Sequence, residues 1–113
     1  MTKDQIPSIL SFPAVESVSI LKSPMSCGMR SGFVALKIGE SVGSHNTGEH
    51  EELIVVLDGV GEVEAEGIQE GRIGKGNVVY IPPNTQHNVF NRRSELLRYV
   101  YIVSPFASNK RNV

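Results

Sequence analysis

Glycine and proline recur so often along this chain of 113 residues that no helix of ordinary length fits between them. The 11 glycines and 6 prolines separate short runs in which valine and isoleucine are frequent. No window free of both residue types shows a sustained apolar repeat of about 3.6 residues, which an amphipathic helix requires. Short β-branched runs divided by turn formers are typical of strands. The sequence therefore predicts an all-β fold.

Seven stretches have the composition of strands, and turn formers lie between most of them. They are residues 18–21, 33–38, 53–57, 61–65, 78–81, 87–90 and 97–103. Strands of this number and spacing suit a jelly roll or a closed barrel. The length suits one domain spanning residues 1–113, with an N-terminal arm over 1–16, a barrel core over 33–105 and a polar tail over 106–113.

The charge and cysteine content argue against several classes of partner and of stabilising site. The chain has 11 basic and 12 acidic side chains, so it lacks the positive surface that nucleic acids or anionic membranes attract. Cys27 is the single cysteine, which rules out an internal disulfide and a thiolate zinc cluster. The sequence shows neither a secretory signal nor an apolar run long enough to span a bilayer. We therefore expect a cytoplasmic protein.

The first stretch that carries chemistry is residues 39–59, which reads as a strand, a tight hairpin near Gly48 and a second strand. Side chains alternate across a strand, so His45 and Thr47 share one face, and His50 and Glu52 share one face of the returning strand. We expect the hairpin to set these four side chains beside one another. Imidazole and carboxylate groups are ligands for Zn, Fe, Mn, Ni or Cu.

The second stretch, residues 76–91, reads as a strand, a turn at Pro82, Pro83 and Asn84, and another strand that opens with His87. Asn84 follows a proline at a turn position where a left-handed backbone is expected, and asparagine tolerates that conformation better than most residues. The third histidine of the chain is thus carried on its own strand.

In these two stretches the sequence resembles the cupin superfamily, and the resemblance covers about residues 33–105. The first family motif is matched by Gly39, His45, Glu52 and Gly59, and the second by Gly76, Pro82, His87 and Asn91. The chain departs from the motifs at Thr47, where the family has a second histidine, and at Asn84, where it has a glycine. Both motifs occur in order and at a suitable separation, which makes the match specific.

The resemblance implies a double-stranded β-helix, or jelly-roll barrel, that holds a divalent metal ion such as Fe, Mn, Ni or Zn. Carried over to this sequence, the family's ligands are His45, Glu52 and His87, and Glu52 is also a candidate catalytic base. His50 lies two residues before Glu52 and is a candidate fourth ligand. Thr47 is a candidate hydrogen-bond partner for a bound water or substrate. The family's habit also implies a homodimer.

Each of these residues also has a purely structural interpretation. His45 and His87 are otherwise hydrogen-bonded interior residues, and Glu52 is otherwise paired with a lysine or arginine. His50 is equally well explained as a solvated turn residue, and Thr47 as a β-former. Two functions follow: a metal-dependent enzyme acting on a small polar molecule, or a non-catalytic module that binds a small ligand or metal.

Overall fold

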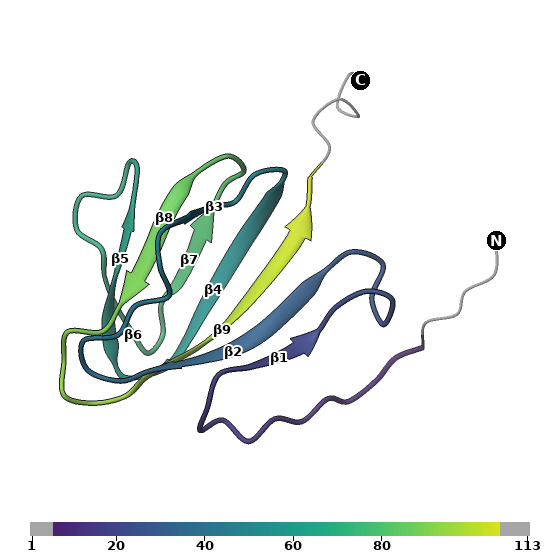
Figure 1. Cartoon of the computed structure of the whole chain (residues 1–113), viewed down its shortest axis with the longest axis horizontal. Coiled ribbons are helices and arrows are strands. Elements are labelled where there is room, and N and C mark those ends of the chain that lie inside the picture. Colours follow the sequence, from purple (N-terminus) through teal and green to yellow (C-terminus); the bar gives the residue numbers. More distant parts are fainter. Residues whose placement is uncertain (1–5, 107–113) are drawn as a thin grey trace.

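The computed structural model describes residues 6–106, and in that range it contains nine strands and no helix (Figure 1). The strands are β1 (Val18–Leu21), β2 (Arg30–Leu36), β3 (His45–Asn46), β4 (His50–Asp58), β5 (Val60–Ala65), β6 (Arg72–Gly74), β7 (Val78–Ile81), β8 (Gln86–Phe90) and β9 (Leu97–Pro105). The all-β prediction is therefore confirmed. The start of the predicted arm and nearly all of the predicted polar tail lie outside the described residues. Within the described range, no helix is long and apolar enough to cross a membrane.

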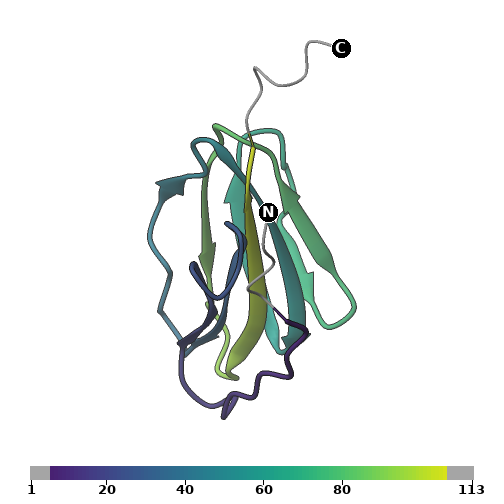
Figure 2. The ribbon, with the colours of Figure 1, turned by 90° about the vertical axis from the view of Figure 1, so that its right-hand side faces the viewer.

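The strands form two antiparallel sheets that face each other (Figure 2). The five-stranded sheet has the order β1-β2-β9-β4-β7, and the four-stranded sheet has the order β3-β8-β5-β6. This two-sheet arrangement is the predicted jelly roll. The predicted closed barrel is wrong, because strand pairing in the described residues does not continue from one sheet into the other.

Alternation along the strands decides which side chains enter the space between the sheets. In β4, Glu52, Ile54 and Val56 point inward and are at most 9% exposed. The apolar core between the sheets consists of Leu36, Ile54, Val56, Val63, Ile73, Val79, Ile81, Val89, Leu97 and Tyr99. Glu52 therefore shares its face of β4 with core residues, although it carries a carboxylate.

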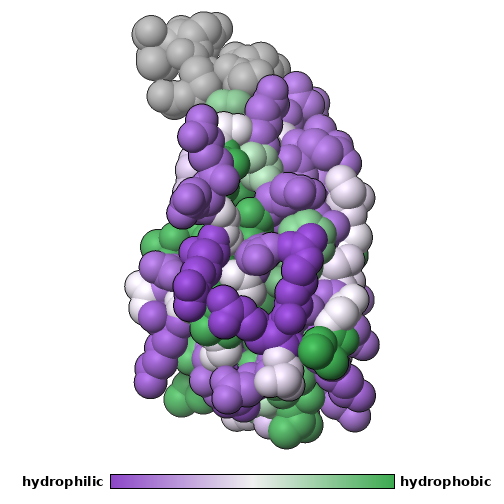
Figure 3. Space-filling view, turned by 90° about the vertical axis from the view of Figure 1, so that its left-hand side faces the viewer, coloured by the Kyte–Doolittle hydropathy of each residue, from purple (hydrophilic) through white to green (hydrophobic). Residues whose placement is uncertain are grey.

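The outward faces of the two sheets differ in character. The side of the molecule that carries β5 and β6 is largely hydrophilic (Figure 3). On the five-stranded sheet, Phe33 is only 1% exposed because the N-terminal segment covers it: the rings of Phe12 and Phe33 lie 5.1 Å apart. The Ser17 hydroxyl accepts a hydrogen bond from the Ala35 amide at 3.0 Å. Phe12 of the predicted arm thus packs on the sheet, whereas Ile6 and Ile9 of the same arm are exposed.

The observed turns and strand bounds agree in part with those predicted from the sequence. Asn84 has φ of 58°, so the left-handed backbone predicted for it is confirmed. The strands β1 and β7 have the predicted bounds, and five others extend or shift them by a few residues. The short strands β3 and β6 have too few β-forming residues to appear in composition alone.

Candidate metal centre

His45 and His87 meet because β3 pairs with β8. The register places His45 directly opposite His87, and their rings lie with centroids 4.1 Å apart at 58°. The predicted hairpin between the strands on either side of Gly48 is wrong. In the structure the chain leaves the four-stranded sheet after Asn46 and enters the five-stranded sheet at His50. Gly48, with φ of 62°, lies in this crossing.

Glu52 reaches the two histidines from the facing sheet. Its Oε1 lies 3.0 Å from Nε2 of His87, and ligand atoms of His45, Glu52 and His87 all lie within 4.8 Å of one another. His87 is 2% exposed and Glu52 is 9% exposed, whereas His45 lies at the exposed side of the group. The structure therefore brings together, from three strands, the three residues that the motif resemblance singled out.

Both imidazole rings are oriented by backbone carbonyl groups. Nδ1 of His45 lies 2.9 Å from the carbonyl oxygen of Gly43, and Nδ1 of His87 lies 3.0 Å from that of Thr85. A carbonyl oxygen only accepts, so Nδ1 of each ring is placed to donate a proton to it. A neutral ring in that tautomer has a bare Nε2. A histidine that ligates a metal almost always donates its other ring proton in this way.

The contact between His87 and Glu52 requires a positive charge. Because the Nδ1 proton of His87 is donated to Thr85, a neutral His87 turns the lone pair of Nε2 toward the Glu52 carboxylate. Two acceptors 3.0 Å apart and shielded from water repel each other. A second proton or a cation relieves that repulsion. The donor set of two imidazoles and one carboxylate fits a divalent transition metal.

Thr47 occupies the position where a further histidine was expected, and its hydroxyl is already engaged. Its Oγ1 donates to the carbonyl oxygen of Pro82 at 2.7 Å and accepts from the amide of Thr85 at 2.9 Å. These bonds tie the crossing segment to the turn before β8, and the backbone amide of Thr47 donates at 3.1 Å to the Thr85 carbonyl oxygen that orients His87. Thr47 also lines the cavity beside the site, so contact with a substrate stays a prediction.

His50 is not part of the group formed by the other two histidines and Glu52. It is the first residue of β4 and is half-buried, and its amide donates to the carbonyl oxygen of Thr47 at 3.2 Å. Although it shares strand parity with Glu52, it stands opposite Pro105 at the end of the sheet. The geometry thus gives no support to His50 as a fourth ligand.

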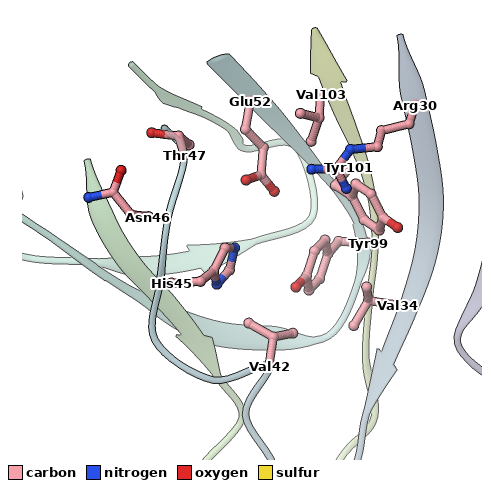
Figure 4. Close-up of a pocket in the computed structure, with 10 residues that line it drawn as sticks. All are labelled: Arg30, Val34, Val42, His45, Asn46, Thr47, Glu52, Tyr99, Tyr101 and Val103. Atoms are coloured by element: carbon pink, nitrogen blue, oxygen red, sulfur yellow. The ribbon is translucent and has the colours of Figure 1, made fainter. Parts of the chain in front are cut away.

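Two of the three residues, His45 and Glu52, line a cavity of about 240 Å³ (Figure 4). Its lining consists of Arg30, Val34, Val42, His45, Asn46, Thr47, Glu52, Tyr99, Tyr101 and Val103. Burial, and secondarily the Glu52 carboxylate, raise the pKa of the Tyr99 phenol well above its usual value. The phenol therefore stays protonated. The side chain of Tyr101 occupies the space beside Gly32. A Cβ added to Gly32 would lie 2.4 Å from the hydroxyl oxygen of Tyr101, so a larger residue here would displace that side chain.

Tyr99 and Arg30 line the cavity, although the sequence patterns do not single them out as site residues. Tyr99 belongs to the apolar core and also reaches the cavity. Its sequence position could have indicated this, because Tyr99 has the same strand parity as the inward-facing Leu97 and Val103. Arg30 lies outside the predicted strand, because β2 begins three residues before the predicted start at residue 33.

Comparison with known proteins supports the fold. Residues 32–103 match the family model described as Cupin domain. An RmlC-like cupin family protein from Methanocaldococcus jannaschii, with a double-stranded β-helix fold, is similar at a TM-score of 0.72 and 20% identity, over 96% of this chain and 98% of that one. A search of curated proteins gives no match.

Other similar structures carry names that refer to enzymes. A predicted oxalate decarboxylase from Thermotoga maritima has a TM-score of 0.73 and 22% identity, over 80% of this chain and 79% of its own. The DMSP lyase DddQ from Ruegeria pomeroyi has a TM-score of 0.62 and 22% identity, over 70% of this chain and 39% of its own. At such identities the likeness establishes the fold and leaves the activity open.

Proposed function

The chain belongs to the cupin domain family, and from that premise we propose that it binds one divalent metal ion through His45, Glu52 and His87 and acts on a small polar molecule in the adjoining cavity. One observation carries the proposal. Both histidines donate Nδ1–H to a backbone carbonyl two residues earlier, so both direct a bare Nε2 to the same space. A matched pair of this kind, beside a buried carboxylate, is the arrangement that ligation requires.

The donor set also fits the function. Three protein ligands of the type His, His and carboxylate leave coordination positions open for a small molecule. Thr47 in place of a further histidine agrees with three ligands, because its hydroxyl is committed to Pro82 and Thr85. The cavity of about 240 Å³ lies on the side of the group where a ligand has access.

A divalent ion bound here supplies Lewis acidity that polarises a bound molecule. The chain's own residues supply the rest. The carbonyl groups of Gly43 and Thr85 hold the imidazoles in place. Glu52 is the carboxylate of the cavity and can accept a proton from a bound molecule, while the protonated Tyr99 phenol donates a hydrogen bond.

A second function, a non-catalytic module that binds a small ligand or metal, is favoured by a different observation. Arg30, His45, Glu52, Tyr99 and Tyr101 are the titratable residues that line the cavity. The histidine and the carboxylate among them both belong to the proposed ligand set, which leaves the cavity no separate imidazole or carboxylate to act as a base. Bound Fe or Mn with an open position favours the enzyme. A metal-free cavity that binds an organic acid or sugar favours the module.

Elemental analysis of protein purified without chelator or nickel resin tests the proposal. We expect stoichiometric metal in the parent and in His50→Ala, and loss of metal in His45→Ala and His87→Ala. His50→Ala is the matched control, because it removes an imidazole outside the group. Circular dichroism of all four proteins verifies folding. Equal, substoichiometric metal in all four would contradict the proposal.

A further inference from the structure

Arg30 is the cationic side chain at the mouth of the cavity. It lies on β2 in the same alternation as Val34, and its side chain extends from the strand toward the cavity (Figure 4). Within residues 6–106, no ion pair or side-chain hydrogen bond engages its guanidinium. By contrast, Arg92 pairs with Glu62 and Arg98 pairs with Asp58. The N–H donors of the Arg30 guanidinium are thus available to a ligand beside the proposed metal site.

The charge of the cavity is positive once the proposed ion is counted. Glu52 contributes one negative charge and Arg30 one positive charge, so the two cancel. Tyr99 is neutral, and His45 is neutral as a ligand. A divalent ion then leaves a net charge of roughly +2, because metal charges dominate such sites. The remaining walls are neutral: three valines and Tyr101, together with Asn46 and Thr47. Electrostatic attraction is stronger in a lining that is largely apolar than in water.

We propose that the cavity takes a small organic carboxylate, and that Arg30 determines this specificity by binding a carboxylate group of the ligand. The inference rests on the proposed function, which supplies the ion that completes the positive charge. A planar guanidinium binds a carboxylate through two parallel, charge-assisted hydrogen bonds. An uncharged amide group on the ligand cannot form this pair of bonds. The Tyr99 hydroxyl offers a further donor within the same cavity. The volume of about 240 Å³ restricts the ligand to a small acid.

Malonate and its neutral analogue malonamide are suitable probes, because they have the same number of heavy atoms and differ in charge. Binding is measured by NMR titration and calorimetry on zinc-loaded and metal-free protein, after the metal content of each sample is determined. The variants are Arg30→Gln, Arg30→Lys and, as a matched control, Arg72→Gln at the exposed first position of β6. Arg72 lies outside the cavity lining.

We expect the parent to bind malonate at least tenfold more tightly than malonamide. Arg30→Gln should bind malonate about tenfold more weakly, since a charge-assisted bidentate contact is lost. Malonamide binding should be unchanged, Arg30→Lys should recover part of the affinity, and Arg72→Gln should match the parent. Full metal content in Arg30→Gln would show that the site itself is intact.

The failures of the two proposals are distinguishable. If the parent takes up zinc and malonate binds equally to the parent and Arg30→Gln, or not at all, the inference about Arg30 is overturned and the metal site stands. If zinc does not bind, the proposed metal function fails. The metal-free titration then decides the inference: malonate binding that depends on Arg30 supports it, and binding that does not overturns it.

Discussion

His45 is the register partner of His87 across β3 and β8, and the two rings are held in the same way. Each donates Nδ1–H to the carbonyl oxygen of the residue two positions before it, Gly43 in one case and Thr85 in the other. Antiparallel pairing brings facing side chains within contact distance of each other. Because β3 contains just two residues, the geometry of the site depends on a very short strand.

The first prediction concerns the protonation of these rings in the zinc-loaded protein. Nitrogen-15 NMR should show that His45 and His87 each carry the proton on Nδ1 and have a zinc-shifted Nε2, because the carbonyl contacts fix the tautomer. His50 serves as an internal control, since it lies outside the group and its nitrogen shifts should not respond to zinc. A zinc-shifted Nδ1 on either ring, or a response from His50, would contradict the proposed ligand set.

The second prediction concerns Thr47, whose hydroxyl bonds to Pro82 and Thr85. Thr47→Val removes the hydroxyl and leaves the amide of Thr85 and the carbonyl group of Pro82 without this partner in a buried place. We expect the free energy of unfolding to fall by about 1–3 kcal/mol, measured by urea denaturation. Zinc affinity should change much less than stability, because the amide of Thr47 still donates to the Thr85 carbonyl oxygen that orients His87. Thr47→Ser retains the hydroxyl and should stay near the parent; equal stability of the valine and serine variants would be inconsistent with this role.

Spacing and alternation in the sequence predict most of the site. The resemblance to the two cupin motifs implies His45, Glu52 and His87 as a group, and the structure brings these three together. The period of two places Glu52 on the core face of β4. The partner of the strand at His45 was not predictable, because two polar residues carry no hydrophobic pattern that fixes a register. Arg30 was missed for a related reason: it precedes the β-rich part of its strand.

The third prediction compares two glycines that have nearly the same backbone conformation. Gly59 has φ of +85° and Gly39 has φ of +83°. A Cβ on Gly59 would lie 2.2 Å from the carbonyl oxygen of Leu96, whereas a Cβ on Gly39 has no atom within 4 Å. Both alanine variants bear the cost of a left-handed backbone, of about 1 kcal/mol. Gly59→Ala should therefore be less stable than Gly39→Ala by a further 1–3 kcal/mol, roughly the cost of a forced backbone shift. Equal melting temperatures would refute this account.

The fourth prediction concerns pH and the pair formed by Asp58 and Arg98 at 2.5 Å. The hydrogen bond from Arg98, together with that from the Gly59 amide, lowers the pKa of Asp58 below its usual value of 3.8. A lowered pKa in the folded state means that the contribution to stability is present above 3.8 and is lost as pH falls through the folded value. Asp58→Asn should thus be less stable than the parent at pH 6, and the difference should vanish in strong acid. Because the carboxylate is exposed, the difference should also shrink at high salt; a difference unchanged between pH 6 and pH 2 would exclude this linkage.

The fifth prediction concerns assembly. Two isoleucines of the N-terminal segment, Ile6 and Ile9, are 76% and 97% exposed, although the adjacent Phe12 packs on Phe33. Apolar side chains presented on one segment are expected to be covered by a second copy of the chain, and we expect a homodimer with about twice the mass of 12.3 kDa. Light scattering over a range of concentrations measures this mass. Ile9→Asp should shift the equilibrium toward monomer, because it places a charge in the apolar contact, whereas Gln69→Asp, in the exposed loop between β5 and β6, should not. A parent that stays monomeric at every concentration would show that these isoleucines face solvent.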